Sequence, residues 1–242
     1  MPVTDKEQRW LDELVAKLRS ALGDRLESVV LYGSGASNSE FQPEFSDLNV
    51  LCVVRDNGGA SLAAMGPAAR WWTAKRQPSP LVLTNEELTQ AADVFAIELT
   101  DMKAKHRVLF GADPLQTLGV PMQLHRLQLE RELRVNLIRL RQRYLAVEGA
   151  GAVARLMGES VSTFVTLFRH VLVAFGERVP PTRREVVAHL ESLLHLDMSA
   201  VHAVLEMRAS GSSALPEKPE KVFDDYLSAL AAVTKDVDQR LA

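Results

Sequence analysis

The stretch that decides the fold reads LYGSGA over residues 31–36 and resumes as FSDLNV over residues 45–50. It lies between two runs of apolar and β-branched residues, 28–32 and 48–54, which predict two buried strands. Gly33 allows the chain to turn tightly at the end of the first strand and to approach an anion closely. The sequence therefore predicts a strand, a Gly-Ser turn, and a second strand that opens at a Ser-Asp pair.

The second of these strands carries two oxygen-bearing side chains on one face. Because side chains alternate along a strand, Asp47 and Asn49 point the same way, while Leu48 and Val50 point into the core. The Ser34 hydroxyl and the free N–H groups of the turn suit a phosphate. Carboxylate and amide oxygens beside a phosphate cradle predict a site for a divalent metal ion, since Mg²⁺ favours a few carboxylates completed by water and substrate phosphate.

This arrangement resembles the nucleotidyltransferase superfamily that includes DNA polymerase β and the aminoglycoside nucleotidyltransferases. The family pattern is a Gly-Ser turn, about nine to thirteen residues, then Asp-x-Asp or Asp-x-Glu in a hydrophobic strand, with a third acid on a later neighbouring strand. Gly33 and Ser34 match the turn, and twelve residues separate Ser34 from Asp47, which matches the first acid. Glu98, in the run AIEL, is the candidate for the third acid. The resemblance covers residues 28–110.

The resemblance implies a mechanism. Three acids hold two Mg²⁺ ions, or Mn²⁺ in their place, and the attacking and leaving oxygens are stabilised together. A nucleoside monophosphate passes from a nucleoside triphosphate to a hydroxyl acceptor on a small molecule, a protein or an RNA end, and pyrophosphate leaves. On this basis Asp47, Asn49 and Glu98 are the expected catalytic and metal-binding residues, and Gly33 and Ser34 are the expected nucleotide-binding residues.

Asn49 departs from the family pattern, because an acid is expected there. An amide oxygen still ligates Mg²⁺ but carries no formal charge, so a large loss of activity follows unless another acid substitutes. Asp101 and Glu44 are two candidates for that role. Two functions therefore stay open: an active transferase, and a weak or inactive relative that binds nucleotide or acts as a regulatory protein.

The rest of the chain predicts an α/β (α+β) nucleotidyltransferase-like domain with a short mixed sheet, residues 1–118, followed by an all-α helical bundle, residues 119–242. Capping boxes, apolar periodicity and Pro or Gly stops set the expected elements. Further strands are expected at 81–83 and 94–99. Helices are expected at 5–22, 61–75, 85–92, 101–111, 122–148, 152–175, 182–194, 198–208 and 219–241.

Composition excludes several classes of protein. Of the 242 residues, 47% are hydrophobic and 24% are charged, which is ordinary for a folded chain. No run approaches the roughly 18 to 20 apolar residues of a membrane span, and the polar first residues are unlike a secretory signal. The net charge of −3 argues against broad nucleic-acid binding. Cys52, the single cysteine, is expected as a buried thiol. We expect a reduced, soluble, cytoplasmic protein without a membrane partner, and a homodimer is left open.

Several other residues have a structural and a functional interpretation. The basic residues after Glu98 form either a charged outer face or a contact to triphosphate: Lys103, Lys105, His106 and Arg107. Arg134 and Arg141 are either solvated or directed at an anionic ligand. Trp71 and Trp72 pack a helix rather than stack a base. The histidines at 189, 195 and 202 lack metal-ligand spacing.

Overall fold

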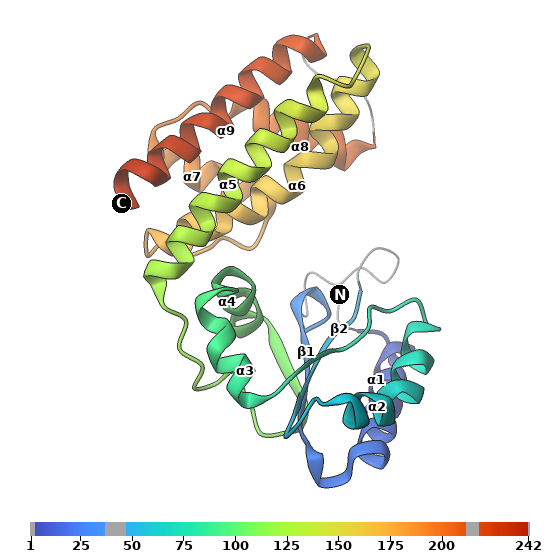
Figure 1. The fold of residues 1–242 in the computed structure, drawn as a ribbon. Coiled ribbons are helices and arrows are strands. Elements are labelled where there is room, and N and C mark those ends of the chain that lie inside the picture. The colour runs from blue at the N-terminus through green and yellow to red at the C-terminus, as the bar shows by residue number, and fades with distance from the viewer. Residues whose placement is uncertain (1–2, 37–46, 212–217, 242) are drawn as a thin grey trace. The chain divides into compact units, whose positions relative to one another are not determined.

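The computed structural model describes residues 3–36, 47–211 and 218–241 (Figure 1). Glu44, considered above as a substitute acid, lies outside these residues. The chain divides into two units, Met1–Pro121 and Met122–Ala242. The predicted boundary near residue 118 falls close to this division, and the existence of two separate domains stays a prediction.

A four-stranded sheet forms the centre of the first unit, in the strand order β3-β2-β1-β4. Its β1 pairs antiparallel with both β2 and β4, whereas β3 runs parallel to β2. The sheet is therefore short and mixed, as predicted. The strands are β1 (Leu26–Tyr32), β2 (Asn49–Val54), β3 (Leu81–Leu83) and β4 (His106–Gly111).

Side-chain alternation along β1 and β2 gives the sheet two apolar faces. Leu31 and Cys52 face α1 (Asp5–Leu22) and α2 (Gly59–Thr73), which cover one side. Burial raises the pKa of the Cys52 thiol to about 12, so this cysteine is a core residue, as predicted.

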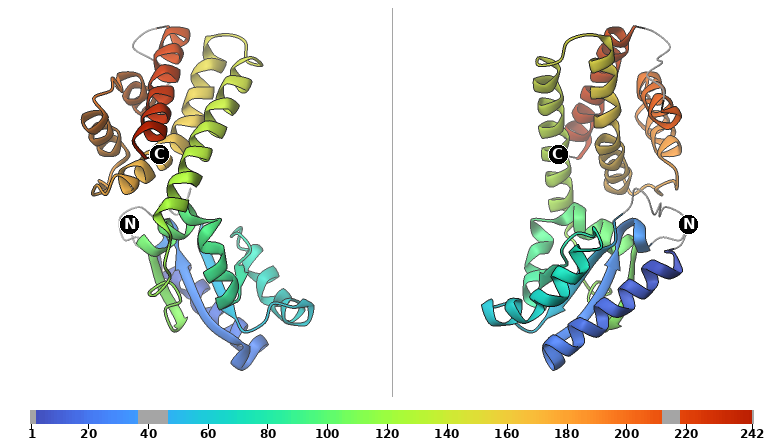
Figure 2. Two further views of the ribbon diagram at one scale, coloured as in Figure 1. Left: turned by 60° about the vertical axis from the view of Figure 1, so that its left-hand side comes forward. Right: turned by 90° about the vertical axis from the view of Figure 1, so that its right-hand side faces the viewer.

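The opposite face of the sheet is covered by shorter elements. Val30, Leu51 and Val53 pack there against α3 (Asn85–Gln90), α4 (Ala96–Ala104) and the chain that follows β4. Figure 1 shows α1 and α2 on one side of the strands and α3 and α4 on the other, and Figure 2 gives two further views of the ribbon. Side chains of even number on β2 therefore face α1 and α2, and those of odd number face α3 and α4.

The prediction of a strand at residues 94–99 is wrong. Val94 and Phe95 precede helix α4, and the rest of the segment is the start of that helix; the fourth strand is β4, in a segment predicted as helix. The buried side chains of Ala96, Leu99 and Met102 recur every three residues, which is the spacing of one helix face. A six-residue run that is apolar except for Glu98 is too short to distinguish a strand from a buried helix, and here the helical period decides.

The second unit consists of helices in the described residues, as predicted. Helix α6 packs against each of the four others and buries Phe164 and Phe168 at the centre of the bundle. The helices are α5 (Met122–Tyr144), α6 (Ala150–Ala174), α7 (Arg183–Leu194), α8 (Ser199–Ser210) and α9 (Pro219–Leu241). Across the described parts of both units, we find no helix with the length and apolar content of a membrane span.

Candidate functional site

The turn after β1 is held against the start of β2. Gly33 has a φ of +77°, a conformation that favours glycine, and its N–H donates to the Lys105 carbonyl at 2.9 Å. Residues Gly33–Ala36 form one turn of 3-10 helix. A Cβ atom at Gly35 would lie 2.9 Å from Cδ2 of the fully buried Leu48. The predicted tight turn therefore needs glycine at both positions, at Gly33 for its positive φ and at Gly35 for its close approach to Leu48.

Replacing Gly35 with alanine is expected to loosen this turn. The added methyl group overlaps Leu48, which is fully buried, and overpacking of this kind costs about 1–3 kcal/mol of unfolding free energy. Urea unfolding measures this loss. Gly59→Ala is the control, because a Cβ there meets no atom within 4 Å. Equal stabilities of the two variants would contradict close packing at Gly35.

Asp47 and Asn49 lie at the same edge of the sheet as this turn. Asp47 is exposed just before β2, and Asn49 is half-buried at the first position of the strand, while Leu48 and Val50 are buried between and after them. The amide nitrogen of the Asn49 side chain lies 3.7 Å from the position that a Cβ would take at Gly33. The structure thus brings together the Gly33–Ser34 turn, Asp47 and Asn49.

A row of polar side chains crosses the sheet beside the turn. Asn49 pairs with Tyr32, and Tyr32 pairs with His106 on β4. All three lie on the face covered by α3 and α4, because paired residues share a face. Burial raises the pKa of Tyr32. Tyr32 could not be recognised from the sequence, because its place in the row depends on the register of three strands.

His106 is held by an acceptor at each ring nitrogen. Its Nδ1 lies 3.1 Å from the Lys103 carbonyl oxygen and its Nε2 lies 2.9 Å from Asp113 Oδ2. Burial acts to raise the pKa of Asp113, but the hydrogen bonds from His106 and from the Leu115 N–H outweigh it and keep this pKa below its usual value. The hydrogen bond between His106 and Asp113 therefore connects the start of β4 to the chain that follows this strand.

Asp113→Asn is expected to lower stability at neutral pH. A depressed carboxyl pKa contributes stability above the pKa of the unfolded chain and loses it as the pH falls through the folded value. The urea midpoint of the variant should therefore lie below that of the native protein at pH 7, and the gap should close below about pH 4. Asp93→Asn, at an exposed position, is the control. A gap independent of pH would contradict a role for the charge of Asp113.

Two other basic residues near β4, Lys103 and Arg107, have structural contacts. Lys103 Nζ donates to the Leu118 carbonyl. Arg107 donates to Gln8 Oε1 at 2.8 Å and so lies on the α1 side of the sheet, away from Asn49. Of these residues, His106 is on the same face as Asn49. The structural interpretation is thereby favoured for Lys103 and Arg107.

Glu98, the expected third acid, lies on α4 and is exposed. Through Leu99 and Met102, α4 packs on the same face of the sheet as Leu51, which is also the face of Asn49. Glu98 therefore belongs to an element on the correct side of the sheet, but not to a strand. Neither β3, which reads LVL, nor β4, which reads HRVLFG, contains Asp or Glu.

These residues do not fit a pair of metal ions. Within the described residues, no three His, Cys, Asp or Glu side chains gather closely enough to hold a metal. One carboxylate, at Asp47, and one amide oxygen, at Asn49, fit a single cation that shares its coordination with a bound triphosphate. The three-acid arrangement that the resemblance implies is thus incomplete in the described residues.

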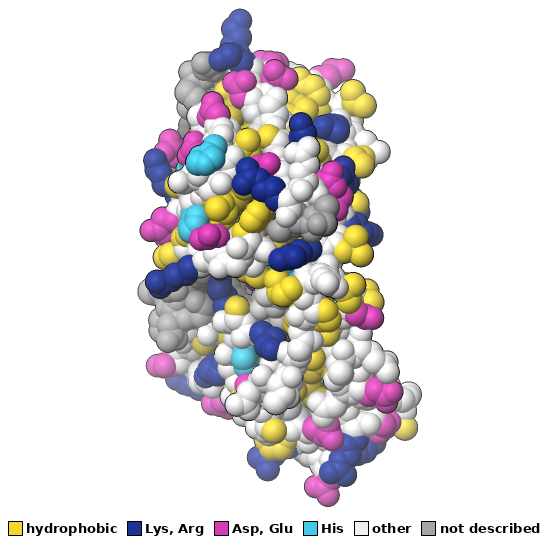
Figure 3. Space-filling model, turned by 90° about the vertical axis from the view of Figure 1, so that its left-hand side faces the viewer, with side chains coloured by type: hydrophobic (Ala, Val, Ile, Leu, Met, Phe, Trp, Pro, Cys, Tyr) yellow, Lys and Arg dark blue, Asp and Glu magenta, His cyan; other side chains and the backbone are white. Residues whose placement is uncertain are grey.

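The other residues with both a structural and a functional interpretation include Trp72, Arg134 and Arg141. Trp72 is fully buried and donates to the Pro78 carbonyl at 2.9 Å, which confirms a packing role. Arg134 pairs with Glu130 and Asp238 at 2.7 Å and 3.1 Å, while Arg141 is exposed. Among the described side chains of the face shown in Figure 3, basic and acidic groups are interspersed.

Similarity to known proteins is confined to structure. No family model matches the sequence, and no curated protein matches it. Among solved structures, the chain is similar to a spectinomycin adenyltransferase, AAD(9), from Enterococcus faecialis, which was crystallised with ATP and spectinomycin. The two share 14% sequence identity and superpose with a TM-score of 0.53 over 90% of this chain and 98% of the other. This similarity shows the fold: a nucleotidyltransferase-like α/β domain followed by a helical bundle.

Proposed function

We propose that this protein binds a nucleoside triphosphate at the edge of the sheet formed by the Gly33 turn and the start of β2, and that it transfers nucleoside monophosphate weakly or not at all. One observation carries the proposal. Of the three acids in the family pattern, the described strands and their first residues supply one, Asp47, just before β2. Asn49 replaces the second acid, and neither β3 nor β4 contains an Asp or Glu that could serve as the third.

Each residue of the site has a role in this binding. The Ser34 hydroxyl and the backbone N–H groups of the turn donate to phosphate oxygens. Asp47 and Asn49 ligate the single Mg²⁺ or Mn²⁺ that accompanies the triphosphate. The missing negative charge at position 49 weakens this cation site, and each 1.4 kcal/mol lost there reduces affinity or rate about tenfold. A protein of this kind senses nucleotide rather than consuming it.

Calorimetric titration with ATP, GTP, CTP and UTP, with and without Mg²⁺, tests the proposal. ATP is the first probe because the similar adenyltransferase was crystallised with it. We expect Mg²⁺-dependent binding of at least one triphosphate and little or no release of pyrophosphate. Asp47→Asn should weaken that binding at least tenfold, whereas Asp12→Asn, an exposed substitution on α1, should not. Failure of all four nucleotides to bind would overturn the proposal.

An active transferase is the second candidate, and the position of α4 favours it. In this case Glu98, on the same side of the sheet as Asn49, takes the proton of the acceptor hydroxyl. The acceptor oxygen bonds to the α-phosphorus, and the bond to the β-phosphate breaks to release pyrophosphate. Spectinomycin, present in the similar structure, is the first acceptor to assay. Pyrophosphate release that Glu98→Gln abolishes, and Glu86→Gln does not, would establish this function in place of the first.

A further inference from the structure

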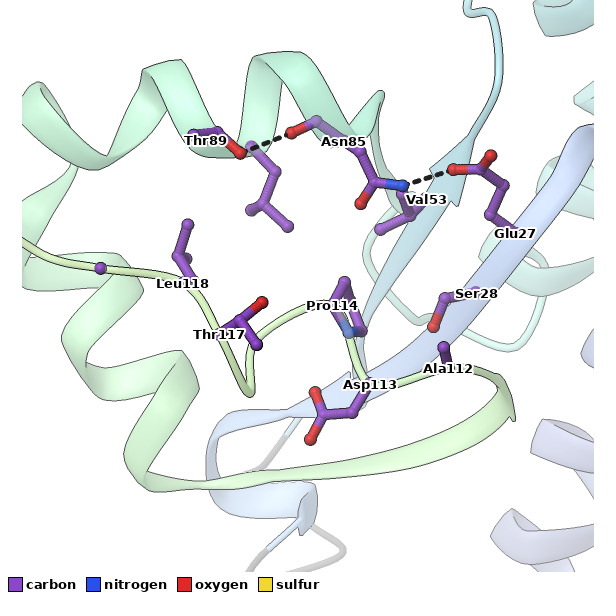
Figure 4. A pocket seen from close by; sticks show the side chains of 12 residues that line it. Glu27, Ser28, Val53, Asn85, Thr89, Ala112, Asp113, Pro114, Thr117 and Leu118 are labelled. Atoms are coloured by element: carbon purple, nitrogen blue, oxygen red, sulfur yellow. Dashed lines mark hydrogen bonds between the residues drawn. The ribbon is translucent and has the colours of Figure 1, made fainter.

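A cavity of about 290 Å³ lies at the other end of the sheet from the Gly33 turn. Its walls are α3, residues 112–119 and the ends of β1 and β2, and it opens to solvent (Figure 4). Ser28, which lines it, pairs with Gly111, whereas Tyr32 at the far end of β1 precedes the turn. The cavity therefore lies at the opposite end of β1 from the proposed nucleotide site, and its Asp113 is hydrogen-bonded to His106 of the polar row beside that site.

Part of the cavity wall is apolar and belongs to the core. Val53, Leu88 and Leu118 line it, and each is buried in the cluster between the sheet and α3. In Figure 4, Leu118 lies across the cavity from Asn85 on α3. A wall of this kind packs against the methylene groups of a small ligand.

Two of the three hydroxyl groups that line the cavity, those of Ser28 and Thr89, present acceptors rather than donors. Ser28 Oγ donates its proton to the Phe110 carbonyl at 3.1 Å, and Thr89 Oγ1 donates to the Asn85 carbonyl at 2.9 Å. A hydroxyl has one proton and two lone pairs, so both oxygens can then only accept from a molecule in the cavity. Among these lining side chains, the hydrogen-bonding capacity left over is mainly that of acceptors.

Two carboxylates add to this imbalance. Glu27 accepts from the Asn85 amide, and Asp113 accepts from His106 and from the N–H groups of Leu115 and Gln116, which leaves lone pairs on both carboxylates. The residues that line the cavity, all of them within the described part of the chain, include no Lys or Arg. Arg55 approaches Glu27 at 3.6 Å, but its side chain is 65% exposed and outside the lining.

We propose that this cavity binds a small organic ammonium ion, a primary amine on a short carbon skeleton. An ammonium group carries three donors, no acceptor and a positive charge, which complements acceptors and carboxylates. Its methylene groups contact Leu88 and Leu118. Linear diamines and amino sugars share this chemistry, and the experiment separates the two.

Amide chemical-shift titration of the full chain tests this site. With 1,4-diaminobutane we expect saturable shifts at Asn85, Thr89 and Thr117. 1,4-Butanediol has nearly the same shape without the charge and should produce no saturable shift. Glucosamine is the second probe: tighter binding than the diamine identifies amino sugars as the ligand class, and weaker binding identifies linear amines. Absence of saturable binding by both amines, or equal binding of the diol, would overturn the proposal.

Matched variants locate the binding. Glu27→Gln removes a lining charge and should weaken diamine binding at least tenfold. Thr89→Val removes an acceptor but no ion pair, and should weaken binding about threefold, so it covers the case in which Glu27→Gln does not fold. Glu86→Gln, an exposed change on the same helix outside the cavity, should leave the affinity unchanged. Unchanged affinity in Thr89→Val together with unchanged affinity or misfolding in Glu27→Gln would contradict the site.

Discussion

Asn49→Asp is expected to strengthen Mg²⁺-dependent nucleotide binding at least tenfold. The substitution keeps the shape of the side chain and adds one negative charge beside the Gly33 turn. At an effective dielectric constant near 20, a unit charge 4 Å from another is worth about 4 kcal/mol before relaxation, and a divalent cation doubles this. Desolvation of the new carboxylate and its repulsion by Asp47 oppose most of the gain. A net gain of about 1.4 kcal/mol already gives the tenfold change.

Calorimetry with ATP, at several Mg²⁺ concentrations, measures this effect. Gln123→Glu adds the same charge at an exposed position in the second unit and is the control. We expect Asn49→Asp to bind ATP more tightly than the native protein does when Mg²⁺ is present. In EDTA, which removes Mg²⁺, we expect the variant to bind ATP no more tightly. Unchanged Mg²⁺ dependence would mean that the side chain at position 49 does not ligate the cation.

Gly111→Ala is expected to produce the largest loss of stability, about 3 kcal/mol or more. Gly111 ends β4 with a φ of +78°, and a Cβ there would lie 2.0 Å from the backbone oxygen of Glu27 on β1. Neither the backbone strain nor the overlap is relieved by moving a side chain, so the pairing of β1 and β4 must open. Backbone effects of this kind belong to the upper range of single substitutions.

Urea unfolding measures the loss, with Gly119→Ala as a closely matched control. Gly119 lies eight residues further along, its φ is not positive, and a Cβ there would meet nothing within 4 Å. We expect the control to lie within about 0.5 kcal/mol of the native protein. A loss for Gly111→Ala no larger than that of the control would contradict the close approach of β4 to β1.

The elements that the sequence predicted well have strong local signals. Residues 28–32, 48–54 and 81–83 are apolar and β-branched runs bounded by turn residues, and each is a strand within two residues of its predicted ends. The capping boxes at Thr4 and Thr182 begin α1 and α7, with Thr84 adding a third at α3. In these segments local propensity and tertiary packing agree.

The segment between residues 94 and 111 shows where local signals fail. Its apolar runs are compatible with a helix or a strand. Two long-range features decide that the first part forms helix α4 and the second part strand β4. Leu99 and Met102 fill the space between the sheet and the helices on its second face, and β4 adds to the free edge of β1. Strand partners that lie about 80 residues earlier in the chain are not visible in a local window.

The candidate site divides in the same way. The turn at Gly33 and the alternation of Asp47, Leu48 and Asn49 were predictable, because spacing and side-chain period decide them. The row of Asn49, Tyr32 and His106 was not, since it depends on the register of β2, β1 and β4. The Asp113 carboxylate reaches His106 only because the chain folds back after Gly111. The catalytic role of Glu98 remains a prediction.

A crystal structure with a non-hydrolysable ATP analogue and Mn²⁺ tests nucleotide binding at this edge most directly. We expect the triphosphate on the Gly33–Ser34 turn and one anomalous peak about 2.0–2.2 Å from an Asp47 carboxylate oxygen. Nucleotide bound anywhere else on the chain, or a pair of manganese peaks shared with Glu98, would contradict a single-cation site with weak or absent transfer.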